Sequence, residues 1–210
     1  MKKINLFNQF NVETLFTKAK KQIQDQVAQW PVSYFEPSEM ERNKQALKNA
    51  VFVDLPEIDF AKGEEVITEK IYPLAEMQPG IKTESKVKVQ VLQFKFSVDG
   101  HLLLLGCQPA GHTAEPPGEW YADTENGEIC LEYKWYSRSP RKTFTAHKQY
   151  IEDVIRSYDE LKSEFGKLGN DIEAYIHDIA AKRKNDWNKH LRLLAGMIHA
   201  SGQEVQGRHL

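Results

Sequence analysis

The sequence has few cysteines and no long hydrophobic runs, and both features limit the class of protein to which the chain can belong. Cys107 and Cys130 are the only cysteines, 23 positions apart, and a single pair without a secretory leader argues against a disulfide framework. Purely apolar runs such as Leu102–Leu105 are far shorter than the ~20 residues of a membrane span. Polar residues interrupt the amino-terminal segment, so it lacks the apolar core of a signal peptide. We therefore expect a cytoplasmic protein with two buried thiols and no membrane contact.

An excess of charge of one sign is also lacking. The formal net charge is −2, with 40% hydrophobic and 28% charged residues, which is typical of a globular protein with a real core. The average charge therefore does not predict nucleic-acid binding. The sequence carries no Gly-x-Ser-x-Gly, phosphate-binding glycine loop, zincin or EF-hand motif. We expect no cofactor, and the balance favours a protein that is not an enzyme.

Two helices are predicted near the amino terminus. Apolar residues recur at spacings of three and four over 12–30, and Pro31 ends that pattern. Ser38 and Glu41 have the spacing of a capping box, which predicts a second helix over 39–49.

Strand patterns follow over 65–137. Residues 65–72 alternate, and residues 85–98 alternate with a change of phase near Val91–Leu92 that predicts a β-bulge. Asp99–Gly100 predicts a tight hairpin with a return strand over 101–107, and Asn126–Gly127 predicts a second hairpin. We therefore expect an antiparallel β-meander of about four or five strands with one buried face.

From Ala146 the apolar period changes to 3.5 residues. One heptad position holds Ile151, Tyr158, Phe165, Ile172 and Ile179, and the other holds Val154, Leu161, Leu168 and Tyr175. The stripe then shifts to Arg183, Trp187, Leu191, Leu194 and Ile198. Gly166 and Gly169 leave two alternatives open, one long helix or a helical hairpin.

The predicted fold is therefore α+β, with an antiparallel meander, amino-terminal helices and a long heptad-patterned helix. The domain boundaries we predict are an α+β domain over 1–145, the helix or hairpin over 146–200, and a flexible tail over 201–210. A stripe this long exceeds what one small domain needs, which favours association with a protein partner or a second copy. The predicted association surface is Ile151, Tyr158, Leu161, Phe165, Leu168, Ile172 and Ile179.

One alternative is a metal-dependent nuclease. Asp123 and the tripeptide Glu132-Tyr133-Lys134 have the order of a D…ExK site, on strands that the Asn126–Gly127 turn would join. In such a site the two carboxylates hold Mg²⁺ and the lysine stabilises the attacking water. Glu-x-Lys is also what the solvent face of a half-buried strand presents by chance, so both interpretations stay open.

A second alternative is a nucleic-acid-binding subunit. Arg138, Arg141 and Lys142 follow a strand that contains Trp135, and interleaved basic and aromatic side chains can bind single strands. The same residues also suit a solvated surface with core aromatics.

The order of elements resembles an uncharacterised bacterial module that precedes effector domains in defence-type proteins. The resemblance rests on the loop Pro31–Pro37 with its aromatic residues Tyr34 and Phe35, the β-meander, the segment Leu168–Tyr175 and the run Ala181–Lys184. It implies a sensing or scaffolding part of a bacterial assembly rather than a catalyst, and it does not centre on Glu132 and Lys134.

Overall fold

The computed structural model describes residues 1–77, 80, 84–111, 115–134 and 138–206. It confirms the predicted α+β class. Contacts divide the chain into two units, Met1–Val12 with Asp54–Gly166 and Glu13–Val53 with Lys167–Leu210. This division differs from the predicted boundary at residue 145, because the amino-terminal helices belong with the later part of the long helix.

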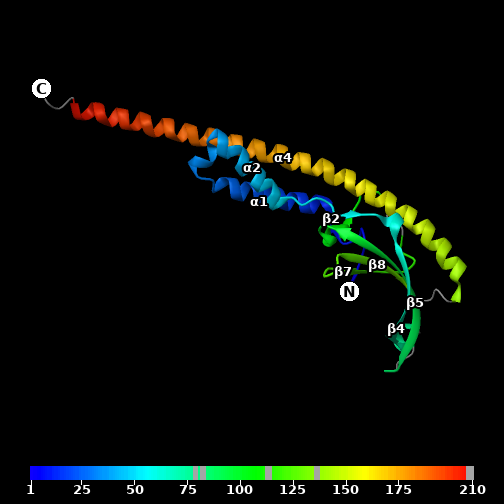
Figure 1. Ribbon diagram of the computed structural model, residues 1–210. Coiled ribbons are helices and arrows are strands. Elements are labelled where there is room, and N and C mark those ends of the chain that lie inside the picture. Colours follow the sequence, from blue (N-terminus) through cyan, green and yellow to red (C-terminus); the bar gives the residue numbers. More distant parts are fainter. Residues whose placement is uncertain (78–79, 81–83, 112–114, 135–137, 207–210) are drawn as a thin grey trace. The chain divides into compact units, whose positions relative to one another are not determined.

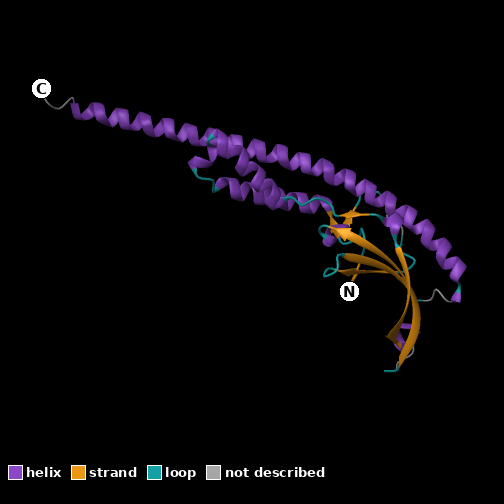
Figure 2. Cartoon of the chain, in the orientation of Figure 1, coloured by secondary structure: helices purple, strands orange, loops and turns teal. Residues whose placement is uncertain are grey.

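The first unit is built on one antiparallel sheet (Figure 2). Its strand order is β1-β7-β8-β5-β3, and β4 also pairs with β5. The strands are β1 (Lys2–Ile4), β3 (Glu57–Ile58), β4 (Glu64–Pro73), β5 (Lys86–Asp99), β7 (Glu119–Asp123) and β8 (Glu128–Tyr133). The hairpin predicted at Asn126–Gly127 joins β7 to β8, with Gly127 at a φ of 65°. β5 pairs with β8 rather than with the next strand in the chain.

The central strand β5 contains no bulge, so that prediction is wrong. Its pairing with β4 keeps one register from Lys86 to Lys95, and its pairing with β8 keeps one register over Leu92–Ser97. The change of phase arises because the buried face changes along the strand. Val89 is half-buried on one face, whereas Phe94 and Phe96 are buried on the other.

The predicted return strand over 101–107 is also wrong. Leu102–Gly106 forms the 3-10 helix η3, and the short strand β6 (Cys107–Gln108) pairs in parallel with β2 (Phe10–Asn11). The turn signal at Asp99–Gly100 is real, since Gly100 has a φ of 115°. It leads into a helical turn because the edge of β5 is already paired with β3 at Val98 and Asp99.

Aromatic side chains fill the core of the first unit. Phe60 of the 3-10 helix η2 (Phe60–Lys62) packs edge-on against Trp120 and Tyr158. Tyr158 lies on the long helix α4 (Pro140–Gln206) and donates to the Pro56 carbonyl at 2.8 Å. Trp120 Nε1 donates to the Tyr150 hydroxyl at 2.9 Å. These buried hydrogen bonds fix the part of α4 that belongs to this unit against the sheet.

The second unit is helical. It contains α1 (Val12–Ala28), the 3-10 helix η1 (Val32–Phe35), α2 (Pro37–Val51) and the later part of α4. Its core is Ile23, Val27, Leu47, Ile172 and Ile176. Lys48 pairs with Glu173 at 2.6 Å, so α2 and α4 are also joined at their surface. Of the two alternatives for the heptad region, the structure shows one helix that continues through both glycines.

Those two glycines generate a matched prediction. A Cβ at Gly166 meets nothing within 4 Å, whereas a Cβ at Gly169 would lie 3.1 Å from Cε1 of Phe52. We expect Gly166→Ala to raise the free energy of unfolding by about 1 kcal/mol through helix propensity. Gly169→Ala should gain less or destabilise, because Phe52 has to shift. Thermal unfolding of both variants checks this, and equal gains would contradict it.

Candidate functional site

The face of the sheet opposite the aromatic core carries a cluster of charged and polar side chains. Alternation along the paired strands places Lys70, Gln93, Glu119 and Glu132 on this one face. Glu119 and Glu132 are direct cross-strand partners in the β7–β8 register. Like charges at opposed positions are destabilising, so this pair requires compensating cations.

Glu132 is the buried centre of that polar face, with 1% of its surface exposed. Its Oε2 accepts from Gln93 Nε2 at 2.8 Å and from the Lys70 ammonium, and its Oε1 accepts from the Tyr72 hydroxyl. Both carboxylate oxygens are therefore occupied by donors from β4 and β5.

Glu119 organises a second set of contacts beside the first. It accepts from Lys3 at 2.8 Å and from the Tyr121 hydroxyl at 2.6 Å, and it pairs with Lys134 at 2.6 Å. The Lys134 ammonium also lies 4.8 Å from the centre of the Tyr72 ring. Because Tyr72 donates to Glu132, this contact connects the two sets into one polar network.

The network keeps both carboxyl groups ionised. Burial by itself raises the pKa of Glu119, but hydrogen bonds from Lys134, Lys3 and Tyr121 outweigh it and lower that pKa to about 2. Burial also acts to raise the pKa of Glu132, and hydrogen bonds from Lys70, Tyr72 and Gln93 again make the net shift downward. Burial beside Glu132 raises the pKa of Tyr72, so its hydroxyl stays a proton donor.

The structure does not bring together the three residues of the D…ExK alternative. Asp123 lies opposite Glu128, four residues from Glu132 along β8, which is ~13 Å at the rise of a strand. Its carboxylate accepts from Asn126 Nδ2 at 3.0 Å and from two backbone amides of the turn. Hydrogen bonding by Asn126 is the largest cause of its lowered pKa. Asp123 thus stabilises the hairpin turn.

The polar network does not have the chemistry of an open cation site. Lysine side chains occupy the position beside the two glutamates that a metal cation would need. The two oxygens of Glu132 also already accept hydrogen bonds. Among the described residues, no group of three or more His, Cys, Asp or Glu side chains is placed to hold a metal ion. Lys70, Tyr72 and Gln93 were not singled out from the sequence, because cross-strand partners cannot be read from one strand alone.

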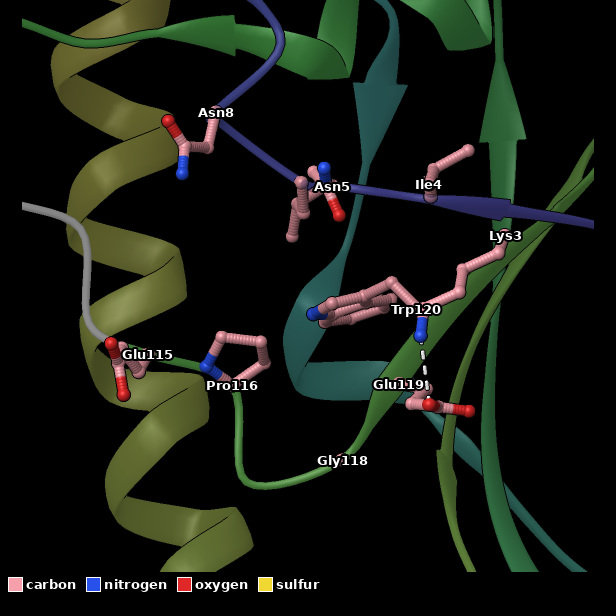
Figure 3. Close-up of a pocket in the computed structure, with 10 residues that line it drawn as sticks. Lys3, Ile4, Asn5, Asn8, Glu115, Pro116, Gly118, Glu119 and Trp120 are labelled. Carbon is pink, nitrogen blue, oxygen red and sulfur yellow. Dashed lines mark hydrogen bonds and ion pairs between the residues drawn. The ribbon is translucent and has the colours of Figure 1, made fainter. Parts of the chain in front are cut away.

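A pocket of about 270 Å³ opens where β1 and the segment before β7 diverge (Figure 3). Figure 3 shows Asn5 and Asn8 on one side, Glu115 and Pro116 on the other, and Trp120 between them. Trp120 is only 2% exposed, so its ring offers little surface for a ligand to stack on. The pocket is small for a ligand site.

The residues of the nucleic-acid alternative lie around the start of α4. Arg141 and Lys142 are exposed in its first turn, and Arg138 precedes it. Trp135 lies outside the described residues.

The predicted association surface is largely buried within the chain itself. Ile151, Tyr158, Leu161, Phe165 and Ile172 are all 8% exposed or less, and Leu168 and Ile179 are half-buried. Tyr158 belongs to the aromatic core, and Ile172 belongs to the helical core. These residues are correctly predicted as an apolar stripe, but the placement of that stripe on a partner needs correction, because the chain covers it.

An uncovered apolar surface lies further along α4. Leu191, Leu193, Leu194 and Met197 are between 43% and 68% exposed, and Trp187 is half-buried one turn earlier. Figure 1 shows α4 continuing past the ends of α1 and α2 within the helical unit. We call Trp187, Leu191, Leu193, Leu194 and Met197 the apolar end of α4. The shift of the stripe to Trp187, Leu191 and Leu194 was the sequence signal for it.

Comparison with known proteins yields no relative, since no family model, curated protein or solved structure matches this chain. The resemblance to a defence-associated bacterial module therefore stays a prediction. No described helix is both long enough and apolar enough to cross a membrane.

The polar network generates a stability prediction. Glu132→Gln removes the charge that Lys70 and Gln93 hold, and we expect a loss of about 2 kcal/mol in the free energy of unfolding at pH 7. The folded-state pKa is lowered, so this contribution is present above the ordinary carboxyl pKa and is lost as pH falls below about 4. The gap between wild type and variant should therefore narrow in acid.

Denaturant unfolding at several pH values measures that gap. Glu125→Gln, at an exposed turn position, is the control and should change stability by less than about 0.5 kcal/mol. Wild-type stability in the Glu132 variant at pH 7 would show that the network contributes nothing.

Proposed function

We propose that this chain is a non-catalytic scaffolding module that associates with a second copy of itself through the apolar end of α4. The observation that carries the proposal is the exposure of Leu191, Leu193, Leu194 and Met197 on one continuous helix. A contiguous apolar patch rimmed by polar residues is typical of an interaction site. The rim here is basic, with Lys184, Lys189 and Arg192 exposed or half-exposed around the patch.

The closed polar network on the sheet supports a structural role for that face, since its carboxylates are already satisfied.

The direct test replaces the apolar end of α4. We expect Leu191→Glu with Leu194→Glu to convert a dimer into a monomer, because two charges would have to be buried in the contact. Light scattering after size exclusion, over a range of concentrations, measures the mass. Asn185→Glu with Asn188→Glu adds the same charge away from the apolar stripe and should leave the dimer intact.

Unchanged circular dichroism in both double variants would show that the fold is retained. A wild-type chain that stays monomeric at about 100 μM would contradict the proposal, since a specific dimer has to form well below that concentration.

Salt offers an independent test of the same surface. Two copies bring two sets of basic side chains together, so screening should relieve repulsion while apolar burial persists. We expect the dimer dissociation constant to fall several-fold between about 20 mM and 500 mM NaCl. A contact held by opposite charges would weaken instead, and sedimentation equilibrium distinguishes the two outcomes.

A further inference from the structure

We infer that the free edge of β4 binds an extended peptide of alternating basic and apolar residues, which joins the sheet as an added strand. This inference does not depend on self-association through α4. It goes beyond the scaffolding role because it gives the chemistry of a second partner and the strand that binds it.

β4 is paired along one side only. Its ten residues pair with β5 from Glu64 to Pro73 in one unbroken register, and the two strands lie side by side (Figure 1). Among the residues that the structure describes, no strand pairs with the other side of β4. The backbone N–H and C=O groups on that side therefore lie outside the pairing of the sheet. Such a row of groups is a template for a further strand.

β4 has few of the features that usually protect an edge strand. Edge strands are commonly short, bulged, interrupted by proline or supplied with inward-pointing charges. β4 is ten residues long without a bulge, and Pro73 is its last residue. Lys70 points onto the polar face of the sheet, but its ammonium is already paired with Glu132. An added strand would therefore not leave the charge of Lys70 without a partner.

The other face of β4 alternates acidic and apolar side chains, and it is exposed along its whole length. Its residues are Glu65, Ile67, Glu69 and Ile71. Ile67 and Ile71 are 54% and 66% exposed. Side chains directly opposite one another on neighbouring strands share a face and interact. Apolar residues at two positions of an added strand would therefore cover the two isoleucines.

The charges along this edge specify the remaining positions. Glu69 pairs with Lys88 of β5. Glu64 and Glu65 are exposed, and neither has an ion pair within the described part of the chain. Opposite charges across a strand pair stabilise it, and like charges destabilise it. The edge therefore favours a strand that places a basic residue opposite Glu65.

A second copy of β4 fits this edge poorly. Antiparallel pairing about a two-fold axis at Ile67 sets Glu65 against Glu69, and an axis at Glu69 sets that residue against itself. An axis at Thr68 sets both glutamates against isoleucines. Each of these registers places like charges together or an acid against an apolar side chain. A basic and apolar peptide satisfies both kinds of position.

A short synthetic peptide provides the direct test. The sequence Thr-Val-Thr-Lys-Thr-Val-Thr-Lys-Thr, placed antiparallel to residues 64–72, sets valine opposite both isoleucines and lysine opposite Glu65 and Glu69. We expect a dissociation constant below about 100 μM, and at least tenfold weaker binding when glutamate replaces both lysines of the peptide. Titration calorimetry measures both affinities. Weaker binding of the lysine peptide, or equal binding of the two peptides, would overturn the inference.

Charge reversal on the protein tests where the peptide binds. Glu65→Lys should weaken binding of the lysine peptide at least tenfold and make the glutamate peptide the tighter ligand. Glu152→Lys is the matched control, because it adds the same charge at an exposed position on α4 in the same unit. At about 150 mM NaCl it should change both affinities by less than about twofold. Equal effects of the two reversals, in variants with unchanged circular dichroism, would show that only net charge matters and would reject the β4 edge.

Hydrogen exchange detects strand addition itself. Unpaired amides of β4 exchange readily in the free chain, and an added strand would slow their exchange. Peptide binding that leaves exchange over residues 64–73 unchanged would contradict pairing at this edge.

The double variant Leu191→Glu with Leu194→Glu separates this inference from the proposed function. We expect it to bind the lysine peptide as tightly as the wild type, whether or not the wild type is a dimer. If the double variant self-associates instead, and Glu65→Lys abolishes that association, a second copy is the occupant of the edge and the peptide inference is wrong.

Discussion

The apolar stripe of α4 has to be shielded from water along its whole length, and the other elements are arranged around that constraint. In the first unit, Phe60 of η2 and Trp120 of the sheet cover it. In the second, α1 and α2 cover Ile172 and Ile176. Beyond α1 and α2, the same side of the helix is exposed to solvent at Leu191 and Leu194. An uncovered continuation of a covered stripe is the physical basis of the assembly that we propose.

The opposite face of the sheet has to accommodate two neighbouring carboxylates. Two glutamates face each other across β7 and β8, and three lysines and two tyrosines neutralise and bind them. The arrangement orders side chains from β1, β4, β5, β7 and β8 at once. A fully satisfied network of this kind specifies strand register, because a slip by one residue would leave Glu132 buried without its partners.

Local patterns in the sequence predicted the elements that depend on local spacing. The 3.5-residue period found α4, and Asn126–Gly127 found the β7–β8 hairpin. Pairings between distant segments could not be found in this way. The run Leu102–Leu105 is apolar at every position, so its pattern fits a strand and a 3-10 helix equally well. Only the β3–β5 pairing decides between the two structures. A heptad stripe likewise shows that a face of a helix is buried, but it does not show whether the same chain or a second copy covers that face. Glu132 is a further example, because it lies on the predicted polar face of its strand but is covered by β4.

The bare end of α4 carries Lys184, Lys189 and Arg192, the residue types after which trypsin cleaves. A helix end without packing partners opens readily, so these peptide bonds are open to cleavage in the free chain. Any contact that covers Leu191 and Leu194 would also hold that helix closed. Under the proposed self-association, resistance to proteolysis would be a property of the assembled form, and a chain left alone would lose the surface that the contact needs.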